Sequence, residues 1–447
     1  MGDARVNRRI VELADILLAS EADSWPDKFA NPADYRAFNR ILNRPQATHH
    51  SVRITHSRQT RHRMGSAQQV VLILHDTTEL DYSGRHTIRG RGPIGNGGCR
   101  GWECHNSLAV VADTGAVLGL ANQILHRRAD SQTTQNEGVA DKRDRVDRES
   151  RLWWQGVEAI GDAPPGQTWV HVCDRGSDSF ELLQKMTDAR RSFVIRSKSA
   201  RVLVRDQQEK PATLHTWVRG LPAQAGWRGV AREGAGASRP VKLQASWAEV
   251  ALRAPHVRRG EHDKRPVKVW VIRVWEVEVP AGEKAVEWIL LTDLSCADIA
   301  TMRDVVSYYQ RRPIVEEYHK AFKSGCGVEK LQQRSRESLQ AAIGITAILA
   351  VGLLELRDLS RDPKRQDEPA ASVVGMRVVC VLSVWRLGVE KPEWTVKEFV
   401  WALGRLGGHM NRPSDGVPGW QTLWRGLRKL RAMVAYSKKA TPTSGTT

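Results

Sequence analysis

The spacing of hydrophobic positions changes several times along the chain, and each change predicts a different kind of element. Residues 1–66 carry apolar side chains at helical spacing. Residues 67–200 alternate between short apolar runs, which are typical of buried strands, and helical patterns. Residues 200–286 are rich in valine and partly alternating, which predicts a β-rich block inserted between two α/β parts. Residues 297–359 and 373–438 return to helical spacing.

This order of elements predicts an α/β protein of more than one domain, since 447 residues exceed what a single core usually holds. We divide the chain into four parts. They are a basic helical domain at 1–66, an α/β domain at 67–372 with the β-rich insertion at about 200–286, a helical segment at 373–438, and a Ser/Thr-rich tail at 439–447 that is expected to be disordered.

The charge of the chain is strongly unbalanced, with a formal net charge of +18. A fold does not require this imbalance, so it favours a polyanionic partner, and nucleic acid is the commonest one. No acidic residue occurs between Asp34 and Asp76. Within that window Arg36, Arg40 and Arg44 are spaced four apart, which puts them on one face of a helix. We interpret this face as a phosphate-contacting surface. Further arginines of the window are Arg53, Arg58, Arg61 and Arg63.

The cysteines and the apolar stretches indicate a reducing, aqueous compartment. The six cysteines form no CxxC pair, which fits the cytosol better than a disulfide framework. The N-terminus is charged and has no signal-peptide core. The most apolar stretch, 341–354, is too short to span a bilayer and is interpreted as a buried core helix. We therefore expect a cytoplasmic protein with no membrane partner.

Two predicted strands end in an aspartate. The apolar runs 72–76 and 170–174 finish on Asp76 and Asp174. Side chains at strand ends are accessible from one edge of a sheet, and oxygen ligands are what Mg²⁺ prefers. Two such ions can activate a water or a 3′-hydroxyl and stabilise the leaving oxygen of a phosphodiester. Taken singly, each aspartate is better explained as a turn or helix cap.

A third carboxylate strengthens the interpretation of the first two. Tyr309, Arg312, Glu316 and Lys323 follow spacings of three, four and seven. In a single helix these spacings put all four on one face. A carboxylate flanked by two cations and a phenol suits a phosphate backbone held over a metal. The alternative is an ordinary surface helix with salt bridges four residues apart, which does not explain the alignment with Glu316.

These motifs together resemble one known family. The array from Tyr309 to Lys323 matches the YREK signature of the insertion-sequence-four transposases, in the subgroup typified by the transposase of transposon five. Asp76-Thr77-Thr78 resembles the first catalytic aspartate of that DDE family, and Cys173-Asp174-Arg175 resembles the second. The similarity extends from about Gly2 to about Met433.

The resemblance implies a fold and an activity. The fold is a ribonuclease H-like catalytic core interrupted by a β-rich insertion, with an N-terminal helical DNA-binding domain and a C-terminal helical dimerisation segment. The activity is cut-and-paste transposition by hydrolysis, hairpin formation and strand transfer. The implied partners are double-stranded DNA, as terminal inverted repeats and target, and a second copy of the chain in a synaptic dimer on the bacterial nucleoid.

The resemblance also assigns residues. Asp76, Asp174 and Glu316 carry over as catalytic ligands of two Mg²⁺ ions, for which Mn²⁺ can substitute. The remaining members of the signature carry over as contacts to the DNA backbone of the transposon end. They are Tyr309, Arg312 and Lys323.

Four further positions match the family outside the signature. Trp288 stands where the family keeps a tryptophan that stacks on a flipped base during hairpin formation, and an indole face suits that role. A core tryptophan leading a strand explains Trp288 almost equally well. Arg196 and Lys198 match positions near the DNA. His105 matches a recurrent family histidine and is interpreted as structural.

Two other functions stay open. Gly2-Asp3-Ala4-Arg5 matches an internal point of the usual family N-terminus, so the chain is expected to start late. Forms of the family that lack the preceding stretch dimerise without binding transposon ends, which makes an end-binding-deficient inhibitor or DNA-binding relative the first alternative. The second alternative is a metal nuclease without strand transfer.

Overall fold

The computed structural model describes the chain from residue 3 to residue 440 with several gaps. The described residues are 3–20, 25–130, 148–198, 201–203, 212–232, 238–255, 262–359, 361–362, 365–412 and 415–440. Most of the predicted tail therefore lies outside the described residues, although Lys439 and Ala440 end a helix instead of belonging to a disordered segment.

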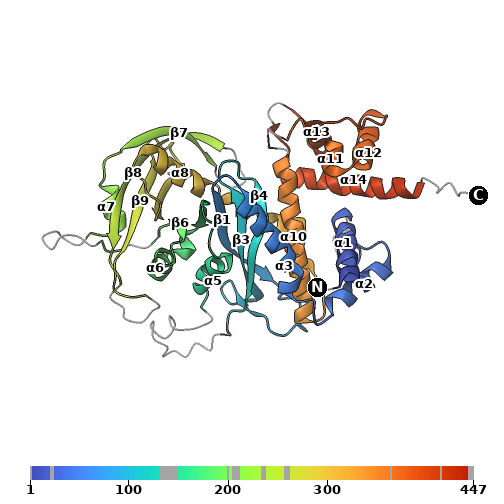
Figure 1. The fold of residues 1–447 in the computed structure, drawn as a ribbon, viewed down its shortest axis with the longest axis horizontal. Helices are drawn as coiled ribbons and strands as arrows, with labels where there is room; N and C mark the ends of the chain where they lie inside the picture. The colour runs from blue at the N-terminus through green and yellow to red at the C-terminus, as the bar shows by residue number, and fades with distance from the viewer. Residues whose placement is uncertain are drawn as a thin grey trace, which may run out of the picture.

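A single mixed sheet runs through the centre of the protein, with helices packed around it (Figure 1). Its strands are β1 (Val71–Asp81), β2 (Gly92–Ile94), β3 (Cys99–Val111), β4 (Val117–His126), β5 (Trp169–Cys173), β6 (Ser192–Arg196), β7 (Ala225–Arg232), β8 (Ser238–Leu252), β9 (Val267–Glu276) and β10 (Glu287–Thr292).

The sheet has a parallel centre and antiparallel flanks. β1, β5 and β6 run parallel to one another. On one side β3 pairs antiparallel with β1, and β4 pairs antiparallel with β3. On the other side β10 pairs antiparallel with β6, followed by β9, β8 and β7. The predicted β-rich insertion thus extends the sheet, and its strands arch away from the parallel centre in Figure 1.

Helices account for most of the remaining described chain. They are α1 (Ala4–Ala19), α2 (Pro32–Leu42), α3 (His49–Ser66), α5 (Arg151–Ile160), α6 (Phe180–Asp188), α7 (Leu214–Arg219), α8 (Ile299–Gln310), α9 (Pro313–Lys320), α10 (Arg336–Leu359), α11 (Ala370–Val374), α12 (Met376–Leu387), α13 (Val396–Leu406) and α14 (Trp420–Ala440), with shorter turns η1 (Arg175–Ser177), η2 (Ala321–Gly325) and η3 (Val328–Lys330).

Strand β1 does not end at Asp76, and this part of the sequence prediction is wrong. The strand continues to Asp81, and Asp76 pairs with Asn106 of β3 in its middle. The physical reason is that Thr77 and Thr78 are β-branched and fit a pleated strand. By contrast, β5 ends at Cys173, directly before Asp174, as predicted.

The N-terminal region is helical, as predicted, but two of its arginines were misplaced. Helix α2 ends at Leu42, so Arg44 lies beyond the helix and does not share a face with Arg36 and Arg40. Arg53 is only 5% exposed, and its Nη2 donates to a backbone carbonyl of β4 at 2.8 Å. Arg53 is therefore a core residue that fixes α3 on the sheet, and it cannot contact phosphate.

Helix α10 forms the spine between the sheet and the helical ends of the chain (Figure 1). Among the described residues it is the one helix long and apolar enough to cross a membrane, and 72% of its most apolar window is buried inside the protein. The prediction of a buried core helix at 341–354 is confirmed by that burial. Helices α1, α2 and α14 all pack on α10.

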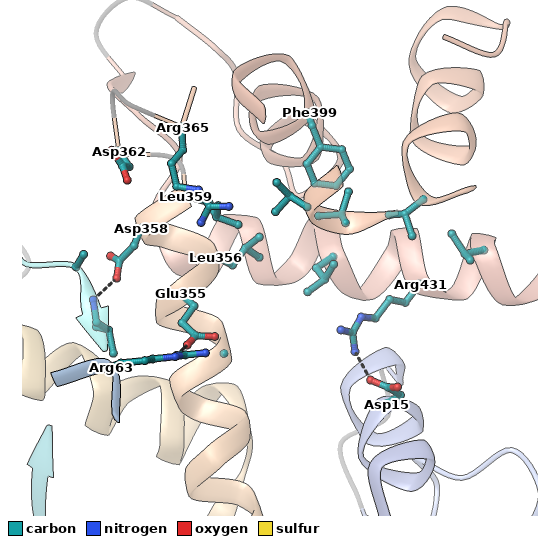
Figure 2. Close-up of a pocket in the computed structure, with 18 of the residues that line it drawn as sticks. Asp15, Arg63, Glu355, Leu356, Asp358, Leu359, Asp362, Arg365, Phe399 and Arg431 are labelled. Carbon is teal, nitrogen blue, oxygen red and sulfur yellow. Dashed lines mark hydrogen bonds and ion pairs between the residues drawn. The ribbon is translucent and has the colours of Figure 1, made fainter. Parts of the chain in front are cut away.

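A hollow of about 970 Å³ lies where the two ends of the chain approach each other (Figure 2). Arg63 of α3 and Glu355 of α10 form an ion pair at 2.7 Å along one side. Arg431 of α14 lies 3.9 Å from Asp15 of α1 on the other side. Helices α1 and α14 thus both pack against α10.

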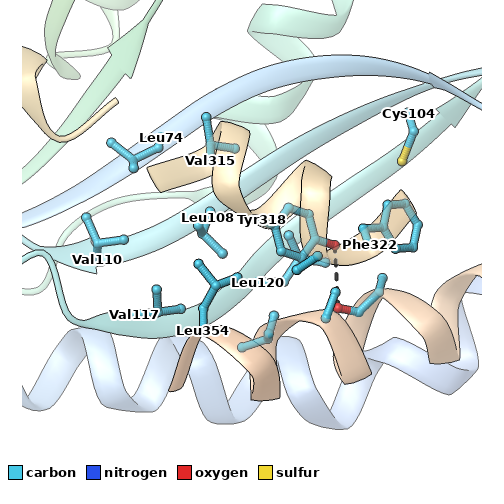
Figure 3. Close-up of a cluster of buried hydrophobic side chains, with 14 of the residues drawn as sticks. Leu74, Cys104, Leu108, Val110, Val117, Leu120, Val315, Tyr318, Phe322 and Leu354 are labelled. Carbon is cyan, nitrogen blue, oxygen red and sulfur yellow. Dashed lines mark hydrogen bonds between the residues drawn. The ribbon is translucent and has the colours of Figure 1, made fainter. Parts of the chain in front are cut away.

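Helix α9 is anchored on the sheet by its apolar side. Val315 and Tyr318 of α9 and Phe322 of the following turn η2 are fully buried, and they pack with Leu74 and Leu108 of the sheet (Figure 3). The spacing of three and seven keeps these anchors on one helix face. The residues on the neighbouring face of α9 are consequently held next to strand β1.

Candidate active site

Asp76 and Asp174 lie side by side because their strands are parallel neighbours. The pairing of β1 with β5 ends at Leu74 and Val172. Each aspartate comes two residues after that last pair, where the two backbones separate and leave room for side chains. Oδ2 of Asp76 lies 3.1 Å from the Nη2 of Arg312, and Oδ2 of Asp174 lies 3.4 Å from the same atom.

Helix α9 brings Glu316 to the same place. Arg312, one turn earlier, forms a close ion pair with Glu316 through its other terminal nitrogen. The Arg312 side chain is 14% exposed. A single guanidinium therefore holds the three predicted carboxylates together.

The predicted single helix carrying the signature is wrong. Helix α8 ends at Gln310, α9 begins at Pro313, and Lys323 lies in the π-helical turn η2. The break follows from Pro313, whose ring and missing N–H favour the first turn of a new helix. Tyr309 and Arg312 nevertheless stay close to each other, because the break falls between two adjacent turns.

The electrostatics of the site favour a cation. Burial raises the pKa of Asp76 to about 6, Arg312 acts against that rise, and the charges of Asp174 and Glu316 add to it. The same carboxylates raise the pKa of Arg312 against the effect of its burial. Crowded, partly buried carboxylates are stabilised in their ionised form by positive charge.

The donor set fits a hard divalent cation in its chemistry. Three carboxylates are the oxygen ligands that Mg²⁺ takes in phosphoryl-transfer sites. Within the described ranges no three acidic, cysteine or histidine side chains stand close enough to hold a metal ion as they are. Arg312 occupies the central position that such an ion requires. The residues therefore fit a divalent cation when the Arg312 side chain moves aside.

The opposite face of β1 carries a buried chain of imidazoles that the sequence analysis did not identify. His75 Nε2 lies 2.9 Å from His171 Nδ1, and His75 Nδ1 lies 3.4 Å from His105 Nε2. His105 Nδ1 in turn lies 2.8 Å from the Thr77 hydroxyl. Burial lowers the pKa of His105 and of His171 to about 3, so both rings are neutral. The structural interpretation of His105 agrees with this arrangement.

Helix α5 packs directly against these rings at Gly156. A Cβ added at Gly156 would stand 2.6 Å from His105 Nε2 and 3.1 Å from His75 Nδ1. Glycine is needed here for close approach of a helix to a packed polar core. The imidazoles are thus tightly packed on the side of β1 opposite Asp76.

An aromatic pair lies beside the carboxylates. The rings of Trp288 and Tyr309 meet edge to face with centroids 5.5 Å apart, and Trp288 is half-buried. Arg196 donates to the backbone carbonyl of Glu287 at 3.0 Å, next to this pair. Burial raises the pKa of Tyr309, while Arg196 and Arg312 lower it, which places all three side chains within interaction range.

Basic residues surround a second hollow next to Glu316. The hollow has a volume of about 620 Å³. Lys323 donates to the backbone carbonyl of Glu79 at 2.9 Å and lies 3.1 Å from Glu329. Lys323 therefore lies at this hollow and does not join the carboxylates. The lining residues are Glu316, His319, Lys320, Lys323, Ser324, Glu329 and Lys330.

The other predicted DNA contacts lie farther from the carboxylates. The Lys198 side chain is exposed, and its backbone N–H donates to buried Asp178 at 2.7 Å. Arg36 and Arg40 are exposed on α2, which Figure 1 shows on the far side of α10 from the sheet. Arg36, Arg40 and Arg44 therefore belong to a separate surface.

Part of this region matches a known protein family. Residues 148–351 match a family model described as the transposase DDE domain. The matched segment contains Asp174 and Glu316 and begins after Asp76. The mixed α/β architecture with its central sheet is consistent with such a domain. Transposases of this kind act on DNA and generally use divalent metal ions. The match supports a DDE transposase family for this chain.

Proposed function

We propose that this chain is a cut-and-paste DNA transposase of the insertion-sequence-four type with a ribonuclease H-like core. The observation that carries the proposal is the convergence of Asp76, Asp174 and Glu316 on one positive charge. The order of the central strands supports the core assignment. An antiparallel hairpin of β3 and β4 flanks parallel β1, β5 and β6.

In this proposal Asp76, Asp174 and Glu316 hold two Mg²⁺ ions, and Mn²⁺ can replace them. The bound ions supply activation of the attacking oxygen and neutralise the leaving oxygen. Arg312 turns from the carboxylates to a DNA phosphate, for which its planar fork is suited. With Arg312 on a phosphate, the three carboxylates would be free to hold the cation.

The surrounding residues handle the DNA. Trp288 offers a half-buried indole beside Tyr309, where an extrahelical base can stack. Arg196 lies beside this pair and is proposed to contact the backbone, as is Tyr309, although only 6% of Tyr309 is exposed before DNA binds. The lysines around the hollow next to Glu316 supply the positive charge that a phosphate backbone requires.

The remaining assignments extend this proposal to the whole chain. The basic N-terminal helices, with Arg36 and Arg40 exposed on α2, bind the terminal inverted repeats. The C-terminal helices α11 to α14 pair two copies so that two ends are held together. Lys198 contacts DNA from the exposed end of β6. The protein works on DNA in the bacterial cytoplasm.

In vitro cleavage of DNA carrying the element's terminal repeats, with Mg²⁺, tests the proposal. We expect hairpin-ended and excised products from the wild type and none from Asp174→Ala. Cleavage without hairpins or joined target DNA would instead establish a plain metal nuclease. A stable dimer that binds no ends and cleaves nothing would establish the inhibitor.

A further inference from the structure

We infer that His319 is a positioning residue for the Asp76 carboxylate, held by Asn106 in the tautomer that directs an N–H at Asp76. The inference rests on the proposed function, because it treats Asp76 as a metal ligand. His319 is not one of the three carboxylates. It lies between the signature residues Glu316 and Lys323 in sequence but is not a member of the signature.

His319 stands at the right place on α9. It follows Glu316 by three residues, so the two side chains share a helix face. Its Nδ1 lies 3.7 Å from Oδ2 of Asp76, and its side chain is 11% exposed. Asp76 Oδ1 already accepts the backbone N–H of Thr77 at 3.0 Å. Oδ2 is therefore the oxygen that faces both His319 and Arg312.

A backbone carbonyl fixes the tautomer of His319. Asn106 Nδ2 lies 3.0 Å from the carbonyl oxygen of Cys104 and 3.1 Å from Nε2 of His319. The carbonyl can only accept, so the amide group of Asn106 that faces it must be the NH₂. Nε2 of His319 then faces a donor and must carry a lone pair. The ring is consequently neutral, and its one proton sits on Nδ1, toward Asp76.

The arrangement continues into the core and is therefore stiff. Gln123 Nε2 donates to Asn106 Oδ1 at 2.8 Å, and His49 Nε2 lies 2.9 Å from Gln123 Oε1. Asn106 is fully buried and Gln123 is 2% exposed. Asn106 also faces Asp76 across the β1–β3 ladder. Buried, mutually satisfied polar groups of this kind hold one conformation.

The consequence concerns the state with DNA bound. When Arg312 turns to a phosphate, the His319 N–H still points at Oδ2 because the core holds the ring. Asp76 then keeps its rotamer and presents its oxygens to the cation. The Nδ1–Oδ2 distance of 3.7 Å is that of an outer contact, and outer groups that orient a metal ligand are worth about 10–100-fold in metal affinity or activity.

Two substitutions at position 319 separate the two ring nitrogens. His319→Asn puts an amide nitrogen where Nδ1 stands, and His319→Gln puts a polar atom where Nε2 stands. We expect His319→Asn to keep a half-saturating Mg²⁺ concentration close to that of the wild type in the cleavage reaction. For His319→Gln we expect a rise of roughly 10–100-fold with little change in rate at saturating Mg²⁺.

The thermal unfolding temperature of each full-length variant is measured alongside its half-saturating Mg²⁺ concentration. Equal behaviour of the two variants, either unchanged or slowed equally at saturating Mg²⁺ with a lowered unfolding temperature, would overturn the inference. Absence of cleavage by the wild type would defeat the proposed function instead.

The tautomer itself can be measured without DNA, metal or activity. ¹⁵N NMR of the histidine-labelled full chain distinguishes a protonated Nδ1 from a protonated Nε2, and loss of the signal in His319→Asn identifies the residue. We expect the proton on Nδ1. A proton on Nε2 would overturn the inference whatever the protein does to DNA.

Discussion

The two faces of the sheet at strand β1 both carry titratable side chains, but one face holds neutral groups and the other holds charged ones. On the face toward α5, His75, His105 and His171 are buried, neutral and hydrogen-bonded to one another. On the face toward α9, Asp76 is crowded against two other carboxylates and depends on Arg312. The first face is a neutral packed core, whereas the second is the proposed cation site.

The difference predicts opposite responses to pH. Burial lowers the pKa of His171 to about 3, below its usual value, so this face stabilises the fold at neutral pH and loses that stability as pH falls. Burial raises the pKa of Asp76 to about 6, so its ionisation weakens the metal-free fold as pH rises. His171 of β5 and Asp76 of β1, on opposite faces of the sheet, thus change the stability of the fold with pH in opposite directions.

The largest expected effect comes from breaking the charged face. Glu316→Gln removes one of the three proposed ligands for the cation. Several kcal/mol of transition-state stabilisation correspond to a loss of about 10³-fold in cleavage rate. Binding to the terminal repeats should change little, as measured by gel shift. Glu317→Gln is the matched control, because Glu317 pairs with buried Arg357 at 2.6 Å. It should lower stability and leave the rate per folded molecule intact; equal loss of binding and cleavage in Glu316→Gln would make Glu316 structural.

The charged face should also be a source of instability. Asp76→Asn removes the ionisation of a buried carboxyl whose pKa is raised to about 6. From pH 4 to pH 8, without divalent metal, the variant should gain up to about 3 kcal/mol in free energy of unfolding relative to the wild type. Urea unfolding at the two pH values measures this gain.

A control of opposite sign is available at the start of α8. Backbone N–H groups lower the pKa of the Asp298 carboxyl, which caps that helix. Asp298→Asn should therefore lose stability at pH 8 relative to pH 4. An unchanged difference between Asp76→Asn and the wild type at the two pH values would mean that Asp76 ionises in the fold without penalty.

The charged face was largely predictable from sequence, although its supports were not. Asp174 follows a short apolar strand, and the structure has it there. Asp76 was singled out as well and lies 3.1 Å from Arg312, but the strand continues past it because the following threonines favour β structure. The spacing argument for one helix ignored Pro313, which was visible in the sequence and breaks the array.

The neutral face and the position of His319 depend on pairings that a sequence does not contain. His75 and His171 sit inside apolar runs, so they read as ordinary strand positions. Asn106 reaches His319 only through the register of β3 against β1. The one available signal was that His319 follows Glu316 by a helical spacing of three.

Packing on the neutral face can be broken with a single methyl group. Gly156→Ala would bring a Cβ within 2.6 Å of His105 Nε2, and overpacking of this kind costs about 1–3 kcal/mol. Gly352→Ala, in α10, is the matched control, because a Cβ there meets nothing within 4 Å. It should stabilise the helix by about 0.5–1 kcal/mol. Thermal unfolding measures both, and a stable Gly156→Ala would mean that α5 can move away from the imidazoles.

The most specific effect tests the sign of the neutral face. His171→Asn keeps a polar atom where Nδ1 meets His75 and removes a group that resists protonation in the fold. Unfolded chains take up a proton on this histidine below about pH 6.5, whereas the folded chain does so only near the lowered pKa. The variant should therefore lose stability less steeply on acidification, by about 1.4 kcal/mol per pH unit over that range. His50→Asn, on an exposed position of α3, controls for loss of a histidine elsewhere. Parallel stability curves for His171→Asn and the wild type would show that the imidazole chain accepts a proton within the fold, and the contrast between the two faces of β1 would not hold.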